Sequence, residues 1–219
     1  MAGLPALKPA ERIVDSVHAA LRAAILDGEL PPGQPLSVPD LSRQLEVSRS
    51  PVREALLALV AEGLAVELPR RGVSVVEVAA SDLLEIHEVR EAVEAQAARL
   101  CAERANDAVL RDLADILVRQ RAVVEGDDAA GWFRTNAEFH GAIAAGTGNR
   151  RLSEVLLVLE AQMRLGLQQV SSDREQRRRG LAEHQAVLDA ITAREPDAAE
   201  RTMRDHIRHT KQALARRLG

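Results

Sequence analysis

The chain has 219 residues, a formal net charge of −4 and three aromatic residues, Trp132, Phe133 and Phe139. So few aromatic rings argue against single-stranded nucleic acid as a ligand, because its bases stack on such rings. The lone Cys101 excludes an intrachain disulfide and is expected to be a small buried residue. No apolar run approaches the roughly 20 residues that span a bilayer, and the N-terminus lacks a signal-peptide core. We therefore expect a soluble cytoplasmic protein with no membrane partner.

The N-terminal third predicts three helices. Apolar residues at every fourth position across residues 13–25 mark one face of a first helix, which ends at Gly28. Ser37 is a favourable N-cap for a second helix. Ser50, with Pro51 directly after it at the first helical position, predicts the start of a third.

A β-hairpin is predicted next. Residues 64–68 and 73–78 are rich in apolar and β-branched side chains, and the Pro-Arg-Arg-Gly sequence at 69–72 indicates a turn with a charged tip. Two short helices, a tight turn and a hairpin form a winged helix-turn-helix. We expect this DNA-binding domain to occupy residues 1–78.

The remainder, residues 79–219, is predicted to be helical throughout. Polar and Gly- or Pro-containing breaks separate six segments, at residues 81–104, 107–125, 129–145, 149–170, 174–194 and 197–217. No solenoid repeat is present. The predicted fold class is therefore mainly α, with a winged helix-turn-helix followed by an all-helical antiparallel bundle for effector binding and dimerisation.

Charge alone does not indicate DNA binding, since residues 1–76 hold eight basic and nine acidic side chains. Contact with DNA must come from a local cluster. In a helix-turn-helix the N-terminal end of the second helix enters the major groove. That end carries Ser48, Arg49, Ser50 and Arg53, and an arginine can donate two hydrogen bonds to one guanine edge.

The predicted hairpin tip adds two more cations. Arg70 and Arg71 lie where a wing meets phosphate or the minor groove, and Gly72 supplies the turn conformation. Arg43 is a candidate phosphate contact. The alternative is that all of these arginines are ordinary solvated surface charges.

Four short stretches together resemble the GntR family of bacterial regulators. They are residues 28–33 (GELPPG), 47–56 (VSRSPVREAL), 62–64 (EGL) and 70–72 (RRG). The likeness covers most of residues 11–77, and the later helices resemble the FCD effector domain of the family's FadR-like branch.

This resemblance implies a homodimer on a short palindromic operator, whose affinity changes when a small molecule binds. It also implies that Arg49 and Arg53 are the principal DNA-reading residues. Pro39 stands where many members have an arginine, so that DNA contact is expected to be absent here.

Three histidines fall on inward faces of three predicted helices: His140, His184 and His206. A buried imidazole needs a partner, and three in one bundle favour a shared centre over three separately satisfied core residues. Imidazoles suit Zn, Ni, Cu or Fe, and Asn136 lies one turn before His140, so both can face one ion.

The histidine pattern also resembles the metal-binding subset of FCD domains. In that likeness Asn136, His140, His184 and His206 hold a divalent transition metal, foremost Zn or Ni. Many members have Asp where this chain has Asn136, a neutral and weaker ligand. The open positions of such an ion commonly take a small carboxylate.

Two arginines are further effector candidates. Arg90 and Glu94 resemble a pair that borders the FCD cavity, and Arg90 could bind a carboxylate as a fork. The alternative is an ordinary intrahelical ion pair. Arg164 is a weaker candidate of the same kind.

The sequence thus predicts a metabolite-responsive regulator, foremost a repressor. Two alternatives remain: a metal-free regulator, and a histidine-metal enzyme with a vestigial DNA-binding unit. An enzyme needs a general base beside the metal, and Glu138 and Glu183 are both expected to point away from the histidines. The arginines at 174 and 177–179 are expected to form a solvated face, and His18, His87 and His209 receive no role.

Overall fold

The computed structural model describes residues 13–167 and 173–218, which fall into two compact units, Met1–Glu77 and Val78–Gly219. Parts of three expectations lie outside the described residues: the N-terminal segment, the end of the helix predicted at 149–170, and the break at residues 171–172.

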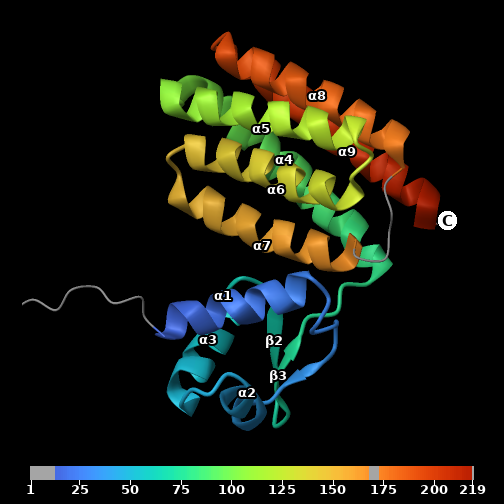
Figure 1. The fold of residues 1–219 in the computed structure, drawn as a ribbon. Helices are drawn as coiled ribbons and strands as arrows, with labels where there is room; N and C mark the ends of the chain where they lie inside the picture. Colours follow the sequence, from blue (N-terminus) through green and yellow to red (C-terminus); the bar gives the residue numbers. More distant parts are fainter. Residues whose placement is uncertain (1–12, 168–172, 219) are drawn as a thin grey trace, which may run out of the picture. The chain divides into compact units, whose positions relative to one another are not determined.

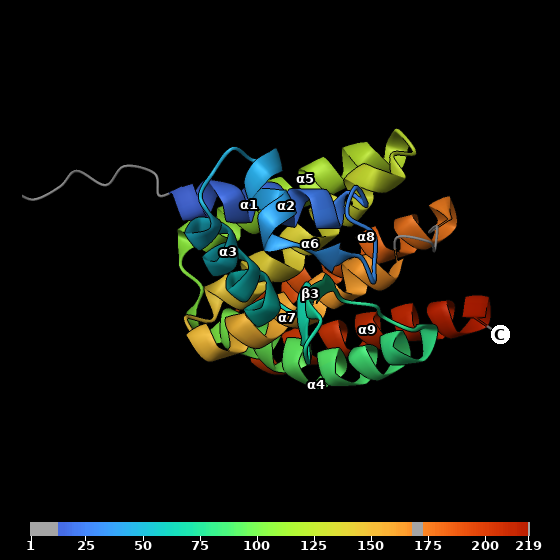
Figure 2. The ribbon, with the colours of Figure 1, turned by 90° about the horizontal axis from the view of Figure 1, so that it is seen from below.

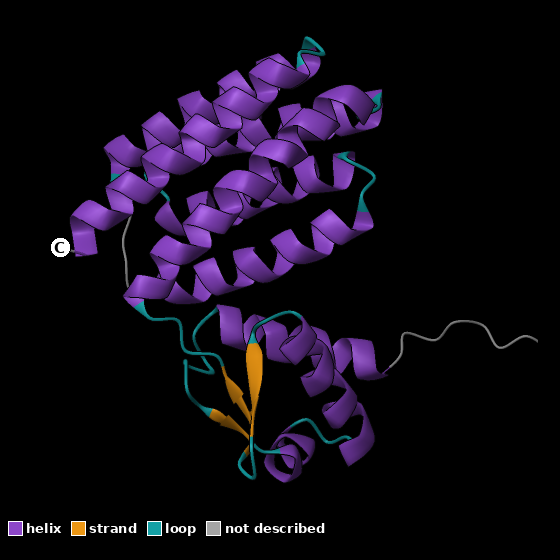
Figure 3. Ribbon diagram, turned by 180° about the vertical axis from the view of Figure 1, so that it is seen from behind, coloured by secondary structure: helices purple, strands orange, loops and turns teal. Residues whose placement is uncertain are grey.

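The N-terminal unit combines three helices with a small antiparallel sheet (Figures 1 and 3). In chain order the elements are α1 (Ile13–Leu26), β1 (Pro35–Leu36), α2 (Val38–Gln44), α3 (Arg49–Ala61), β2 (Ala65–Leu68) and β3 (Gly72–Val75). The strand order is β1-β3-β2, with Pro35 opposite Ser74 and Ala65 opposite Val75.

The predicted helical stripe of α1 is the face that it buries. Val17, Leu21 and Ile25 are buried, and α1 packs against α3, which contributes Val52 and Leu56. The i, i+4 spacing places these side chains one above another on a single face. The core of this unit therefore follows directly from the sequence pattern.

The start of α3 differs from the prediction. Ser48, and not Ser50, occupies the N-cap position with extended backbone, so Pro51 is the third helical residue. The first four N–H groups of a helix have no intrahelical acceptor, so a proline is tolerated at any of those positions. Ser50 instead donates its hydroxyl to Glu54 Oε1 at 3.2 Å.

The strand β1 was not predicted, because two residues are too few to show a period. It is fixed by long-range pairing: the Gly33 amide donates to the Val75 carbonyl at 3.0 Å, and the Val75 amide donates to Gln34 at 2.9 Å. Gly33 has a φ of +79°, a conformation that glycine adopts without strain.

The C-terminal unit consists of helices alone in its described part (Figure 3). They are α4 (Ala80–Arg104), α5 (Asp107–Glu125), α6 (Ala129–Gly146), α7 (Arg150–Leu167), α8 (Arg174–Thr192) and α9 (Pro196–Leu218). The fold class and these six segments are as predicted. None of the described helices is long and apolar enough to cross a membrane.

The central element of this bundle is α4. It packs against α6, α7, α8 and α9, and Figure 2 shows it running beside α9. Side-chain caps begin three other helices: Asn106, Asp128 and Asp173 each accept a bond from an amide in the first turn. The core lies among the helices and includes Phe139, which is fully buried.

Candidate functional site

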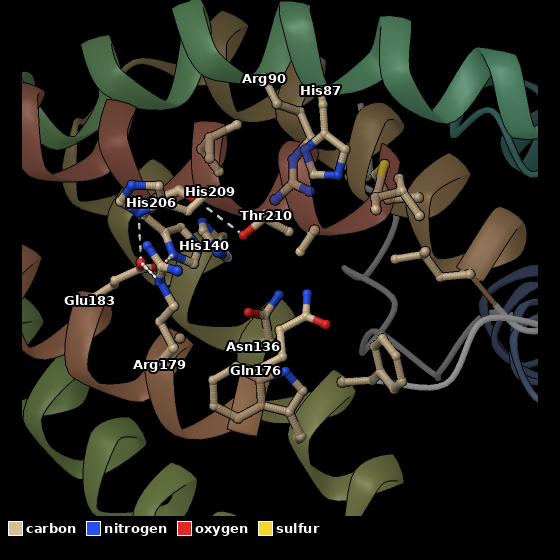
Figure 4. Close-up of a pocket in the computed structure, with 18 of the residues that line it drawn as sticks. His87, Arg90, Asn136, His140, Gln176, Arg179, Glu183, His206, His209 and Thr210 are labelled. Atoms are coloured by element: carbon tan, nitrogen blue, oxygen red, sulfur yellow. Dashed lines mark hydrogen bonds and ion pairs between the residues drawn. The ribbon is translucent and has the colours of Figure 1, made fainter. Parts of the chain in front are cut away.

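A cavity of about 470 Å³ opens within the C-terminal unit (Figure 4). Its lining comes from five helices, α4, α6, α7, α8 and α9. It includes Arg90, Asn136, Arg164 and two of the three predicted histidines, His140 and His206. The sequence-predicted effector and metal residues are therefore brought to one region of the bundle.

The three predicted histidines converge. His140, His184 and His206 are all buried, and each offers a ring nitrogen within 4.8 Å of the other two. His184 Nε2 and His206 Nε2 are 3.3 Å apart. Three imidazoles from α6, α8 and α9 thus form one cluster, called here the histidine triad.

Each triad member has an oxygen at its other nitrogen. His184 Nδ1 lies 2.9 Å from Gln120 Oε1, and His206 Nδ1 lies 2.8 Å from Glu183 Oε2. His140 Nδ1 forms an ion-pair contact with Glu94 Oε2 that does not have the geometry of a hydrogen bond.

These acceptors determine the chemistry of the triad. An oxygen acceptor beside Nδ1 favours the proton on Nδ1 and leaves a lone pair on Nε2. His140 Nε2 has no hydrogen-bond partner among the described residues, and the facing Nε2 atoms of His184 and His206 repel each other unless a cation or proton lies between them. An outer shell that orients three imidazoles in this way is typical of a metal centre, so these residues fit a metal ion.

Packing holds His184 rigidly. Its ring stacks on Phe139 with centroids 4.3 Å apart and on Trp132 at 5.6 Å. Its partner Gln120 is fully buried and donates through Nε2 to the Thr135 carbonyl at 3.0 Å. The amide of Gln120 is therefore fixed in the orientation that presents Oε1 to His184.

Burial favours the neutral form of two triad imidazoles, His184 and His206. Desolvation lowers the pKa of His184 well below its ordinary value, with His206 and His140 adding to the effect. Desolvation also lowers the pKa of His206, although Glu183 partly opposes the shift. A neutral imidazole is the form that binds metal, so these nitrogens are available at neutral pH.

A buried ion-pair chain supports the triad from α4. Arg90 Nε donates to Glu94 Oε1 at 2.6 Å, and Arg90 Nη2 lies 3.6 Å from Glu160 Oε2. Burial alone would raise the pKa of Glu94, but Arg90 and His140 hold it far below its usual range. The Arg90–Glu94 pair is thus a buried link to His140 and not a surface pair.

Glu183 corrects one expectation. It was expected to point away from the histidines, yet its carboxylate contacts His206, accepts from Arg179 at 3.0 Å and lies 2.8 Å from His209 Nδ1. The side chain faces α9, a neighbour that the position of Glu183 beside His184 does not reveal. Both its oxygens are engaged, so it is not a free base.

Other residues also differ from expectation. Arg177 is buried and pairs with Asp127, so the arginines of α8 are not all solvated. His87 and His209, given no role, both line the cavity. Glu138 points away as predicted, toward Arg119, and Cys101 is buried with its pKa raised to about 11 by burial.

The predicted DNA-reading residues lie at the exposed start of α3. Within the described part of the chain, Arg49 and Arg53 have no acidic partner, and their side chains are exposed. Arg70 and Arg71 are likewise exposed at the β2–β3 turn. Arg43, by contrast, pairs with Asp40 at 3.0 Å on the surface.

Comparison with known proteins identifies the two parts of the chain. Residues 13–75 match the family "Bacterial regulatory proteins, gntR family", and residues 85–209 match the FCD domain. A Streptomyces ambofaciens protein described as an uncharacterized HTH-type transcriptional regulator in an unstable DNA locus is 31% identical over 88% of this chain and 80% of its own.

Two further likenesses span nearly the whole chain. The HTH-type transcriptional repressor RspR of Escherichia coli is 26% identical over 95% of this chain and 91% of its own. The solved structure of E. coli McbR/YncC superimposes with a TM-score of 0.79 over 96% of this chain and all of that chain, at 24% identity, which shows a shared fold. The family consists of transcription regulators and not enzymes. With its helix-turn-helix and its FCD domain, this chain belongs to the GntR family of transcriptional regulators.

Proposed function

We propose that this protein is a cytoplasmic repressor whose operator affinity is controlled by a small carboxylate, bound at a histidine-coordinated divalent metal in the C-terminal cavity. The observation that carries the proposal is the convergence of three buried ring nitrogens, with an oxygen beside Nδ1 of each histidine. Residues 1–78 are assigned to DNA binding, and residues 79–219 to effector binding and dimerisation.

His140, His184 and His206 would hold the ion through Nε2, and Asn136 would offer its amide oxygen. Asn136 lines the same cavity, and its side chain has no partner within the described residues. When bound, a Zn or Ni ion supplies positive charge and open coordination positions for an anion.

Charge around the triad favours a metal-dependent carboxylate site. The groups linked to the triad are two guanidinium groups, Arg90 and Arg179, and three carboxylates, Glu94, Glu160 and Glu183. The formal charges of these five groups sum to −1, which disfavours an anion beside the triad. A divalent cation reverses that sign, and Arg90, with Arg164 on the cavity wall, could then pair with the carboxylate.

The DNA-binding roles follow from position. Arg49 and Arg53 would read base edges, while Ser48, Ser50 and Arg43 would contact phosphate. Arg70 and Arg71 would bind DNA through the wing, with Gly72 completing its turn. A homodimer would place two such units on a palindromic operator, and the name of RspR supports repression as the outcome.

The metal proposal is tested by elemental analysis of untagged protein purified without chelators. We expect about one equivalent of a transition metal per chain, lost in a His140→Ala/His184→Ala double variant. Glu138→Gln is the matched control, since Glu138 faces Arg119 and not the triad. Absence of metal even after reconstitution with Zn and Ni would refute the metal centre and favour a metal-free carboxylate site.

The DNA proposal is tested by operator binding at fixed ionic strength, because phosphate contacts make affinity salt-dependent. Arg49→Ala and Arg53→Ala should each weaken binding by about 1–3 kcal/mol and relax base specificity. Arg150→Ala is the control, an exposed arginine on α7. Affinity unchanged in both α3 variants would contradict the proposed DNA-reading role.

A further inference from the structure

One buried polar side chain in the cavity is left unexplained by the metal centre. His87 is 1% exposed, and neither of its ring nitrogens has a hydrogen-bond partner among the described residues. A buried polar group without a partner costs about 1–3 kcal/mol. Because His87 lines the cavity, a bound molecule could supply the missing bonds.

His87 is separate from the histidine triad. The cluster whose nitrogens lie within metal-binding range of one another contains the triad histidines and not His87. In Figure 4 His87 lies beside Arg90, on the side of the cavity away from His206 and Glu183. His87 therefore faces a different part of any ligand that reaches the triad.

Charged and apolar groups both lie near His87, and Arg90 is its labelled neighbour in Figure 4. On α4 His87 directly follows Ile86, which packs with Leu83, Met163 and Leu214 in a small hydrophobic cluster. Met163 and Leu214 also line the cavity. Burial and the nearby Arg90 lower the pKa of His87 to about 3. At neutral pH its ring therefore offers one donor and one acceptor.

We propose that His87 is a specificity-determining residue that binds a hydroxyl group of the effector, on the side of the cavity away from His206 and Glu183. A hydroxyl both donates and accepts, so it can satisfy a neutral imidazole from either side. A carboxylate only accepts and an ammonium only donates, so neither can bond to both kinds of ring nitrogen.

The cavity is large enough for a ligand that reaches both the triad and His87. A volume of about 470 Å³ lies within the range of pockets that enclose drug-sized molecules. A hydroxy acid with a short apolar middle would join the triad, Arg90 and His87 in one complex. This inference rests on the proposed carboxylate site and adds the class of effector.

The test compares two matched probe series with the metal-loaded, full-length protein. The probes are ω-hydroxyalkanoates and alkanoates of equal length, from about three to eight carbons, titrated by calorimetry. At one length we expect the hydroxy acid to bind roughly tenfold or more tightly than its alkanoate, since one unmade buried hydrogen bond costs that much.

Two variants assign the preference to His87. His87→Phe keeps a planar ring without polar atoms and should bring the two affinities to about the same value, with metal content unchanged. His87→Gln can still donate and accept, so it should retain part of the preference.

Three outcomes would overturn the inference. Equal affinities in the wild type at every length would refute the hydroxyl contact while leaving the carboxylate site intact. A preference that persists in His87→Phe would refute the assignment to His87. Failure of both series to bind would refute the carboxylate site itself, and this inference with it.

Discussion

At the tip of the β2–β3 hairpin, Arg70 has a φ of +65°, in the left-handed region. The Arg71 amide donates to the Leu68 carbonyl at 3.0 Å, and Pro69 follows Leu68 in the turn. In a four-residue turn with proline at its second position, the third residue has a positive φ and is normally glycine or asparagine. A non-glycine residue there costs about 1 kcal/mol or more, which favours a functional reason for the arginine.

Two substitutions separate the charge of Arg70 from its conformation. Arg70→Asn should leave the free energy of unfolding within about 0.5 kcal/mol of wild type, because asparagine tolerates this region. Arg70→Val should lower that free energy by about 1–2 kcal/mol, because a β-branched residue does not.

Both variants should weaken operator binding, and Arg70→Asn should reduce the slope of log affinity against log salt by about one. Chemical denaturation and operator titration at several salt concentrations measure the two effects. A full salt slope in Arg70→Asn would show that Arg70 does not contact phosphate.

At the scale of helices, the approach of α8 to α6 depends on Gly180. A Cβ atom at Gly180 would lie 2.8 Å from Trp132 Cζ2. Trp132 in turn stacks on His184. The position of one triad histidine is therefore linked to the absence of a side chain one turn earlier in α8.

Gly180→Ala tests this link. It should lower the free energy of unfolding by about 1–3 kcal/mol through overpacking and weaken metal binding by displacing Trp132. Gly141→Ala in α6 is the matched control, since its Cβ would meet nothing within 4 Å. That control should raise stability by about 0.5–1 kcal/mol, as alanine in a helix interior does.

Denaturant titration and metal-affinity measurement on both variants give the answer. If Gly180→Ala gained stability as Gly141→Ala does, the close helix contact would not constrain the bundle.

At the scale of the whole molecule, buried neutral histidines make stability depend on pH. The folded-state pKa of His87 is about 3, and those of His184 and His206 are also lowered, each chiefly by burial. In the unfolded chain a histidine titrates near 6.5. Protons therefore bind preferentially to the unfolded state as the pH falls below that value.

The metal-free protein should accordingly be most stable above about pH 7 and lose stability as the pH falls from 6.5 toward 5. Each such histidine contributes a slope of up to about 1.4 kcal/mol per pH unit. Glu94 and Glu183 have lowered pKa values. Their contribution to stability is fully present above the unfolded pKa of about 4.5 and is lost only as the pH falls below it.

Urea denaturation at pH 7.5, 6.5, 5.5 and 5.0 in the presence of chelator measures this dependence, and His87→Phe should reduce the slope. Equal free energies of unfolding at pH 7.5 and 5.0 would contradict the assignment of neutral, buried imidazoles.

Much of the architecture is determined locally and was readable in the sequence. Periodic apolar positions and polar caps specify helices without reference to distant residues, so the segments from α4 to α9 lie close to their predicted bounds. The same periodicity placed His140, His184 and His206 on inward faces. The start signals of the third helix placed Arg49 and Arg53 in its first turns, where both side chains are exposed.

What only the tertiary structure decided is which side chains meet. Gln120 reaches His184 across 64 positions of sequence, and Glu183 turns toward His206 on the neighbouring helix. His87 has no partner because none of the described helices around it offers one. Helix periodicity fixes the direction of a side chain relative to its own axis. The choice of neighbour depends on how the helices pack, which no local pattern encodes.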